Sequence, residues 1–234
     1  DANQGIASFA GAFSFSKRPI FATFHDLYWK DWHKLYRFPF SSIGRLLEFS
    51  WSKLSYRRII ANSNQTKEKL LTLGFKSPID VINSGINLNL VNKIKAKKSK
   101  ITTAVYAGRL INYKNVDVLI RAFSKVSNKA DAKLTIIGTG PEEKRLRQLA
   151  KELQVNAEFL GFLSEEEKIK KIKEATLLIN PSTIEGLGLI LLEAMACKTA
   201  TIAFDLPCYK DFCNENNSLL IKNPGAVCKC FKAL

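Results

Sequence analysis

Two cations close together make the segment from Gly108 to Lys114 a candidate phosphate-binding loop. Arg109 and Lys114 lie five residues apart between a predicted strand and a predicted helix, and Gly108 lets the backbone turn tightly before them. An arginine offers phosphate a planar fork of donors and a lysine offers a compact charge, a pairing that suits a diphosphate. Because the chain has a net charge of +15, two solvent-exposed surface cations are the competing interpretation.

The segment from Asn180 to Met195 is more informative. It contains Glu185, then Gly186 and Gly188, and then a predicted helix that carries Glu193. Glycines at a helix start expose backbone N–H groups, and the helix dipole there favours anions. Phosphates at those amides and hydroxyls at the two carboxylates describe a nucleotide diphosphate sugar. The alternatives are a partly exposed helix residue for Glu193 and a surface acid for Glu185.

A third segment, Gly138-Thr139-Gly140-Pro141, is a glycine turn that leads into a predicted helix. Such turns connect strands and helices in many α/β proteins, so this one is weak evidence for a ligand.

Strands and helices that would position these segments alternate along the chain. Apolar runs predict strands over 20–24, 57–62, 79–82, 102–107, 134–137, 158–160, 176–179 and 199–204. Helical spacing of apolar residues predicts helices over 40–56, 64–73, 116–126, 142–153 and 189–197. A capping box formed by Ser164 and Glu167 predicts one more helix start, and Gly74 is expected to end a helix in the left-handed conformation.

Repeated strand–helix–strand units with nearly continuous apolar strands predict an α/β protein with doubly wound parallel sheets. We expect two Rossmann-like domains, over 1–90 and 91–234, joined near residues 88–100 through a linker that contains the lysine-rich run 93–100. The first domain is expected to be truncated, since residues 6–10 read like the middle of a domain. Ligands of such sheets bind at the carboxyl ends of the strands, where the three segments fall.

Composition narrows the class of protein. No apolar run approaches the ~20 residues that cross a bilayer. The five cysteines, all within the last forty residues, form no CxxC pair and indicate reduced thiols in a cytoplasmic protein. The positive charge would suit nucleic acid, anionic lipid or a phosphorylated substrate. Residues 40–58 mix Phe, Leu and Trp with Lys53, Arg57 and Arg58, which suggests either a membrane surface or ordinary packing on the first sheet.

Together the motifs resemble glycosyltransferase family 4, whose members have the GT-B fold and contain a glycosyl transferases group 1 domain. The match consists of four segments in the family's order and spacing, and it covers residues 57 to about 225 well and 1–56 loosely. Those segments are Ala107–Leu110 with Lys114, Ile137–Pro141, Phe159–Phe162, and Pro181–Ala196 with Glu185 and Glu193 eight positions apart.

The resemblance implies a retaining, hexosyltransferase-type enzyme that moves a sugar from a UDP- or GDP-linked donor to a glycan, lipid or other hydroxyl acceptor. It implies that Arg109 and Lys114 bind the diphosphate, Glu193 the ribose hydroxyls and Glu185 the transferred sugar. His25 resembles a family histidine that faces the sugar, although a structural histidine is nearly as well supported. The implied catalytic residues are Glu185, His25, Arg109 and Lys114.

The implied donor-binding set adds backbone that faces the base, near Phe162 and Leu163, and the amides from Gly186 to Leu189. In full it is Gly108, Arg109, Lys114, Gly138, Phe162, Leu163, Glu185, Gly186, Leu187, Gly188, Leu189 and Glu193. No metal and no cofactor are expected, because the cations and the helix start can stabilise the leaving diphosphate. Two acids beside a glycine-rich helix start also suit ligand binding better than glycosidase chemistry.

Departures from the family pattern leave an alternative open. Cys197-Lys198-Thr199 replaces a usual glycine after the helix, and Asn87 stands where Asp is common. The first N-terminal strand with its glycine loop and the C-terminal bracing helix are missing from the pattern. The alternative is therefore a truncated, non-catalytic donor-binding module. Expected partners are a nucleotide-sugar donor, a glycan or lipid-phosphate acceptor and, through peripheral association, an anionic membrane at the cytoplasmic face, but no nucleic acid.

Overall fold

All nine strands in the described part of the chain run parallel to their neighbours, in two separate sheets. The computed structural model describes residues 20–127 and 132–222. They divide into unit 1, which is the chain up to Ser84 with Ile184–Leu187 and Pro207–Asp211, and unit 2, which is the remainder. The predicted boundary between residues 90 and 91 stays a prediction.

The sheet of unit 2 has the strand order β6-β5-β4-β7-β8-β9. Its first strand, β4, therefore lies in the middle beside its fourth, β7, which is the 3-2-1-4-5-6 order of a doubly wound sheet. The order reverses between these two strands, where such sheets bind ligands. The strands are β4 (Thr102–Ala107), β5 (Ala132–Ile137), β6 (Ala157–Gly161), β7 (Leu177–Asn180), β8 (Ala200–Phe204) and β9 (Leu219–Ile221).

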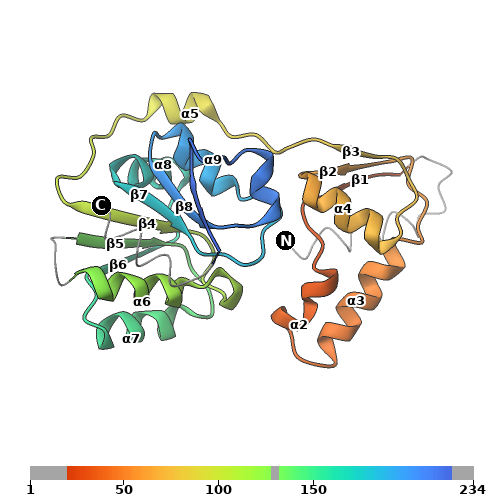
Figure 1. Ribbon diagram of the computed structural model, residues 1–234, viewed down its shortest axis with the longest axis horizontal. Coiled ribbons are helices and arrows are strands. Elements are labelled where there is room, and N and C mark those ends of the chain that lie inside the picture. Colours follow the sequence, from red (N-terminus) through yellow and green to blue (C-terminus); the bar gives the residue numbers. More distant parts are fainter. Residues whose placement is uncertain (1–19, 128–131, 223–234) are drawn as a thin grey trace. The chain divides into compact units, whose positions relative to one another are not determined.

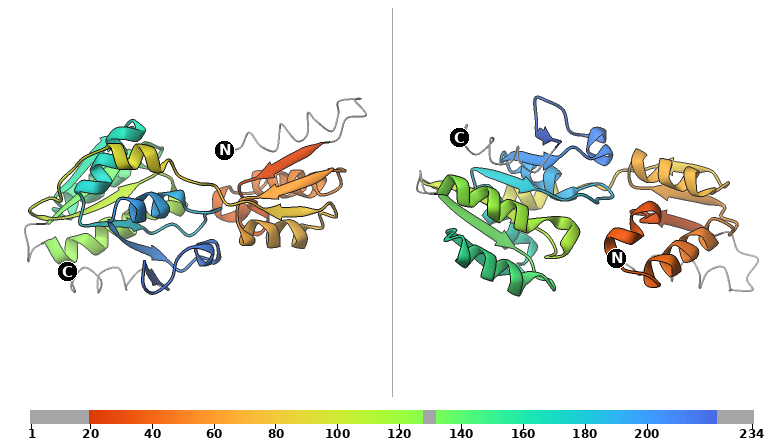
Figure 2. Two further views of the ribbon diagram at one scale, coloured as in Figure 1. Left: turned by 90° about the horizontal axis from the view of Figure 1, so that it is seen from above. Right: turned by 60° about the horizontal axis from the view of Figure 1, so that its bottom comes forward.

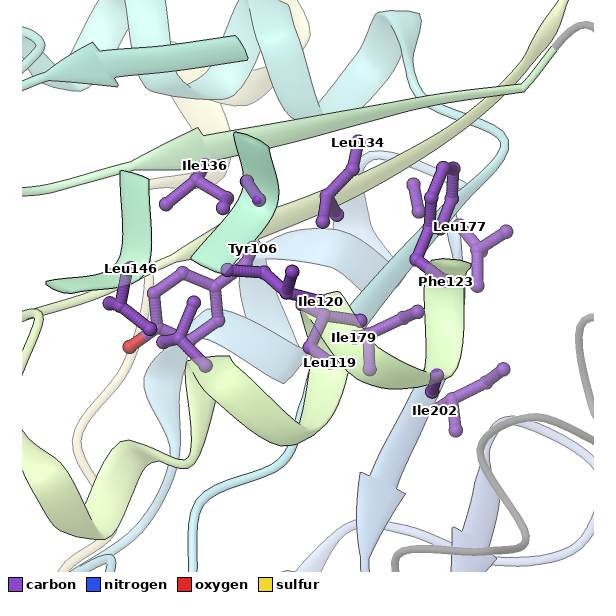
Figure 3. Packing of buried hydrophobic residues seen from close by; sticks show 14 of the residues in the cluster. Tyr106, Leu119, Ile120, Phe123, Leu134, Ile136, Leu146, Leu177, Ile179 and Ile202 are labelled. Carbon is purple, nitrogen blue, oxygen red and sulfur yellow. The ribbon is translucent and has the colours of Figure 1, made fainter. Parts of the chain in front are cut away.

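Helices cover both faces of this sheet (Figure 1). One face carries α6 (Val116–Ser127) and α7 (Glu143–Glu152), and the other carries α5 (Leu88–Lys93), α8 (Glu165–Glu174) and α9 (Leu189–Ala196). Between α6, α7 and the strands lies a core that includes Tyr106, Leu119, Phe123, Ile136 and Leu177 (Figure 3). The doubly wound prediction is confirmed here, and the predicted helices and strands differ from the observed ones by one or two residues at most ends.

The lysine-rich segment predicted as a linker packs along the end of α8. Lys98 Nζ donates to the Ala175 carbonyl at 2.6 Å, and the Ser99 amide donates to the Glu174 carbonyl at 2.8 Å. In return Lys173 Nζ donates to the Ile94 carbonyl at 2.8 Å. Cations and donors at a helix C-terminus satisfy its last carbonyls and its dipole, so part of this charge is structural.

Two departures from the family pattern have local explanations. Asn87 caps α5 by accepting a hydrogen bond from the Leu90 amide at 3.0 Å, a task that Asp and Asn perform about equally well. Lys198 takes the left-handed conformation (φ 55°) in the turn after α9, where a glycine is usual. The Thr199 amide then donates to the Ala194 carbonyl at 2.9 Å and closes that turn.

Unit 1 has the strand order β1-β2-β3, with β1 (Phe21–Phe24), β2 (Arg58–Ala61) and β3 (Ile79–Val81) side by side (Figure 2, left). After β1 come a 3-10 turn, η1 (Trp29–Asp31), and two helices, α2 (Trp32–Leu35) and α3 (Phe40–Trp51). Then α4 (Asn64–Leu73) joins β2 to β3, and Gly74 ends it in the left-handed conformation (φ 95°), as predicted.

The helix predicted over 40–56 ends at Trp51, and the stripe of apolar residues along it is exposed, which disagrees with the alternative of ordinary packing on the first sheet. Its buried residues are Gly44 and Glu48. The apolar side chains of Ile43, Leu46 and Leu47 are 49%, 68% and 44% exposed. Helical periodicity predicted an apolar stripe correctly but not its direction.

The thiols of Cys197, Cys208 and Cys213 are buried and free, whereas Cys228 and Cys230 lie outside the described residues. Among the described helices, none combines the length and the apolar character needed to cross a membrane.

Candidate functional site

The loops that follow β4, β5 and β6 are joined by hydrogen bonds at the carboxyl edge of the unit 2 sheet. Their backbone pairs are Gly108 N with Ile137 O (2.9 Å), Leu110 N with Thr139 O (2.9 Å) and Gly138 N with Gly161 O (2.7 Å). A Cβ on Gly138 would overlap the carbonyl of Gly108, so only glycine permits this approach. The structure therefore brings together the predicted loops at 108–114 and 138–141.

The loop after β4 is also tied to the segment after β7, across the point where the strand order reverses. A 3-10 turn, η2 (Asn112–Lys114), ends in Asn115. Its Tyr113 carbonyl accepts from the Thr183 amide at 3.0 Å, and Asn115 Nδ2 donates to the Pro181 carbonyl at 3.0 Å. These bonds fix Lys114 beside the segment that leads to α9.

Both predicted phosphate-binding cations lie around one aromatic ring. Arg109 Nη2 donates to Tyr113 Oη at 3.1 Å, and Lys114 Nζ lies 5.6 Å from the centroid of the Tyr113 ring. A cation over an aromatic face is attracted by the ring quadrupole, so Tyr113 orients both charges. The sequence reasoning missed Tyr113, although its place between the two cations was visible.

The start of α9 offers backbone donors. Gly188 precedes the helix in the left-handed conformation (φ 82°), and no side chain caps it. In α9 the Leu191 amide donates to the Gly188 carbonyl at 3.0 Å, so the candidate donors to an anion are the amides that precede it. Leu189 begins the helix, and Glu193 lies about one turn further along.

Glu193 is held by a residue that the sequence reasoning missed, Lys168 of α8. Lys168 Nζ lies 3.1 Å from Glu193 Oε1 and 3.0 Å from Oε2, and the Glu193 side chain is only 15% exposed. Burial raises the pKa of Glu193, while the hydrogen bond and charge of Lys168 oppose that rise. The signal was absent locally, because the two residues are 25 positions apart.

Phe162 and Leu163 follow β6 at the same sheet edge. The Phe162 side chain is 84% exposed, so an aromatic face is accessible beside the backbone that was expected to face the base. The role of this backbone stays a prediction.

Unit 1 holds the other predicted residues. His25 follows β1, and a Cβ on Gly186 would overlap its carbonyl oxygen, which explains a glycine there. The neighbouring Asp26 pairs with Lys69 at 2.6 Å. Burial raises the pKa of Asp26; Lys69 lowers it and the nearby carboxylate of Glu185 raises it further.

The predicted site residues thus fall into two sets. Unit 1 contains His25, Glu185, Gly186 and Leu187, and unit 2 contains Gly108, Arg109, Lys114, Gly138, Phe162, Leu163, Gly188, Leu189 and Glu193. Within the part of the chain that the structure describes, no three His, Cys, Asp or Glu residues group as metal ligands would. The expectation of metal-independent chemistry stays a prediction.

Comparison with known families gives two matches that together span nearly the whole chain. The model described as glycosyl transferases group 1 matches residues 90–230, and the one described as glycosyltransferase family 4 matches residues 2–90.

Similar proteins are longer than this chain. An uncharacterized glycosyltransferase of Methanocaldococcus jannaschii is 30% identical over 190 residues, which are 73% of this chain and 48% of that protein. A GDP-mannose-dependent monoacylated alpha-(1-6)-phosphatidylinositol monomannoside mannosyltransferase of Corynebacterium glutamicum is 38% identical over 112 residues, which are 44% of this chain and 29% of that protein. The chain thus spans half or less of the length of these relatives.

Among solved structures, HepE of Anabaena in complex with UDP and glucose superposes with a TM-score of 0.81. It is 21% identical, and the match covers 99% of this chain and 66% of that one. This likeness confirms the predicted GT-B-like fold class.

Proposed function

This chain belongs to the glycosyl transferases group 1 family, and from that premise we propose that it binds a UDP- or GDP-linked sugar and transfers the hexosyl group with retention. The acceptor would be a hydroxyl of a glycan, a lipid phosphate or a related molecule. One observation carries the proposal: Arg109 and Lys114 surround Tyr113 where the strand order reverses, next to the segment leading to the uncapped start of α9.

In this proposal the unit 2 residues bind the nucleotide. Arg109 and Lys114 hold the diphosphate, Glu193 accepts hydrogen bonds from the ribose hydroxyls, and backbone at Phe162 and Leu163 faces the base. Gly108 and Gly138 keep the loops thin, so that the diphosphate can approach the backbone. The amides of Gly188 and Leu189 add donors at the start of α9.

The chemistry needs stabilisation of a leaving group. The bond between the anomeric carbon and the diphosphate oxygen breaks, and the acceptor oxygen forms a bond to that carbon as its hydroxyl proton passes to an oxygen of the leaving diphosphate. Negative charge grows on the diphosphate, where Arg109 and Lys114 would stabilise it electrostatically. His25 and Glu185, with the amides of Gly186 and Leu187, would contact the transferred sugar, with no metal or cofactor.

Calorimetric titration of the chain with UDP- and GDP-sugars tests this proposal. We expect saturable binding of one nucleotide class, reduced at least tenfold in both Lys114→Ala and Glu193→Ala. Lys151→Ala is the matched control, because it removes an exposed cation from the last turn of α7. That turn lies at the opposite end of the helix from the loop at 138–141. A folded chain that binds neither nucleotide class would refute the donor site.

The alternative, a donor-binding module without turnover, predicts the same titrations but a different product analysis. Release of UDP or GDP from the sugar donor in the presence of acceptor hydroxyls would support the transferase. If the chain binds the donor but releases no nucleotide from it with any acceptor tested, the donor-binding module is favoured.

We further propose that unit 1 binds an anionic membrane from the cytoplasmic side, through the outward face of α3. Ile43, Leu46 and Leu47 form an exposed apolar stripe there. Between residues 34 and 58 the chain carries six Lys or Arg and a single acid, Glu48, which is buried. An apolar stripe bordered by cations suits insertion among anionic headgroups. A lipid-phosphate acceptor would explain the positive charge of the chain in the same way, so that charge does not require a nucleic-acid partner.

Co-sedimentation with vesicles tests this surface. We expect binding to vesicles of phosphatidylcholine with phosphatidylglycerol, but little binding to phosphatidylcholine alone, and a loss of binding in Leu46→Ser. Leu71→Ser is the control, since Leu71 is 54% exposed on α4 of the same unit. Equal binding by both variants, or self-association of the chain relieved by Leu46→Ser, would contradict a membrane role.

A further inference from the structure

Lys168 of α8 is shared between two carboxylates. Its Nζ lies 2.8 Å from Glu165 Oε2 and 3.0 Å from Glu193 Oε2. The side chains of Lys168 and Glu193 are 17% and 15% exposed, whereas that of Glu165 is 68% exposed. The pair between Lys168 and Glu193 is therefore largely shielded from water, and Glu165 is the outer partner.

The sequence fixes Lys168 in this place through the start of α8. Ser164 and Glu167 form a capping box, which sets the first turn of the helix, and Glu165 and Lys168 are then neighbours three positions apart. Ile169, the next residue, is buried and anchors α8 on the sheet face that also carries α9 (Figure 1). Lys168 consequently reaches Glu193 from a helix whose register is fixed.

We propose that Lys168 is a positioning residue of the donor site: it keeps the Glu193 carboxylate charged and oriented to accept hydrogen bonds from the ribose hydroxyls. The inference rests on the proposed function. Lys168 acts through Glu193, since its three donors already face two carboxylates. Glu193 Oε1 accepts from Lys168, and a carboxylate oxygen has room for a second donor.

The charged groups around Glu193 set the direction of this effect. From α8 they are Lys168 and Glu165; burial and Glu165 raise the pKa of Glu193, and Lys168 lowers it. Directly after α9, Cys197 is the other titratable neighbour, and Lys98, Lys168 and Lys173 act on its thiol as well. The strands β7 and β8 contribute no titratable side chain, and α5 contributes Lys93 in its last turn.

Removal of the Lys168 charge therefore has a predictable consequence. Burial would then raise the pKa of Glu193 without its main opposing partner, so a larger fraction of the carboxyl would be protonated below neutral pH. A protonated, misoriented carboxyl is a weaker acceptor for hydroxyls, whereas contacts to the diphosphate and base do not depend on it.

The test compares ribonucleotides with nucleotides that lack the hydroxyls. UDP, GDP and their 2′,3′-dideoxy forms are titrated into wild type, Lys168→Met, Lys168→Arg and Glu165→Gln between pH 5.5 and 8.5. We expect wild type to prefer the ribonucleotide about tenfold. Lys168→Met should lose this preference near pH 6 and regain part of it at higher pH, with unchanged affinity for the dideoxy form.

The two other variants make the test independent of how well Lys168→Met folds. Lys168→Arg keeps a cation and should keep most of the preference. Glu165→Gln removes a carboxylate that raises the pKa of Glu193, so its preference should extend to lower pH than in wild type. This shift is opposite in sign to that of Lys168→Met.

Three results would overturn the inference, and the third would also refute the proposed function. If wild type prefers the ribonucleotide, but Lys168→Met and Glu165→Gln show the same preference and pH profile, Lys168 has only a structural role. If Lys168→Met weakens both nucleotide forms equally, the loss is structural too. If wild type binds no nucleotide at any pH, the proposed function itself fails, and this inference fails with it.

Discussion

One helix from each unit differs in where its apolar residues lie: α6 buries them against the sheet, and α3 exposes them. In unit 2, α6 places Leu119, Ile120 and Phe123 against the sheet, where they are fully buried. In unit 1, α3 turns Gly44 and Glu48 inward and leaves Ile43, Leu46 and Leu47 exposed. Both stripes have helical spacing, so spacing alone does not decide which face packs.

The difference comes from what lies beneath each helix. The inward side of α3 meets the Trp32 ring, which packs so closely on Gly44 that a Cβ there would overlap it. Glu48 Oε1 accepts a hydrogen bond from the Tyr28 amide at 2.9 Å, so the polar side chain has a reason to face inward. The outer stripe is then left for another surface, which we propose to be a membrane.

The largest expected effect contrasts one leucine from each helix. Leu119→Ala should destabilise unit 2 by about 3 kcal/mol, because it removes a fully buried side chain and leaves a cavity. Leu46→Ala, at a site that is 68% exposed, should cost less than about 0.5 kcal/mol. Urea unfolding measures both. Similar costs for the two substitutions would mean that the α3 stripe is packed, and the comparison would collapse.

A second prediction concerns the buried carboxyl of α3. Burial raises the pKa of Glu48 above its ordinary value, and Oε2 has no hydrogen-bond partner among the described residues. The pKa of Glu48 is higher in the folded than in the unfolded protein, so the protonated carboxyl favours folding at low pH. This contribution to stability is lost as pH rises from the unfolded-state pKa through the folded-state pKa. Glu48→Gln should therefore stabilise the chain by about 1 kcal/mol at pH 7.

The same substitution should have little effect below pH 4, where the carboxyl is protonated in both states. Urea unfolding at pH 3.5 and pH 7 separates the two conditions, and Glu68→Gln, on α4, controls for a change of net charge. If Glu48→Gln destabilises the chain at pH 7, the charged carboxylate makes a stabilising interaction in unit 1, which contradicts this prediction.

The sequence predicted the local part of this molecule well. The capping box at Ser164 and the left-handed Gly74 were predicted because each depends on residues within one helical turn. The glycine loops fell at the carboxyl ends of strands because parallel α/β units dictate it. The choice between the two alternatives for α3 could not be made from the sequence, since the direction of its apolar stripe depends on Trp32 and Tyr28 from a different segment.

The residues of the candidate site also divide into those that the sequence could predict and those that depend on distant contacts. Arg109, Lys114 and Glu193 were chosen by spacing and by the family resemblance, and the structure places all three in unit 2. Tyr113 and Lys168 were missed, because their importance lies in distances to other side chains. Lys168 in particular is one lysine among many in a basic chain until α8 packs beside α9.

The smallest expected effect sharpens the comparison, because it tests a lysine of unit 2 in a backbone conformation that glycine adopts more readily. Lys198 has φ 55° in the turn after α9, a conformation that costs a residue with a Cβ about 1 kcal/mol. Lys198→Gly removes that cost but adds freedom to the unfolded chain, so we expect a net gain of about 0.5 kcal/mol. Thermal unfolding should show it beside Lys198→Ala, which removes the charge but keeps the backbone cost. If both variants gain equally, relief of charge repulsion explains the gain. If only glycine gains, the left-handed Lys198 costs stability, and the turn tolerates that cost because the Thr199 amide and the Ala194 carbonyl hold it closed.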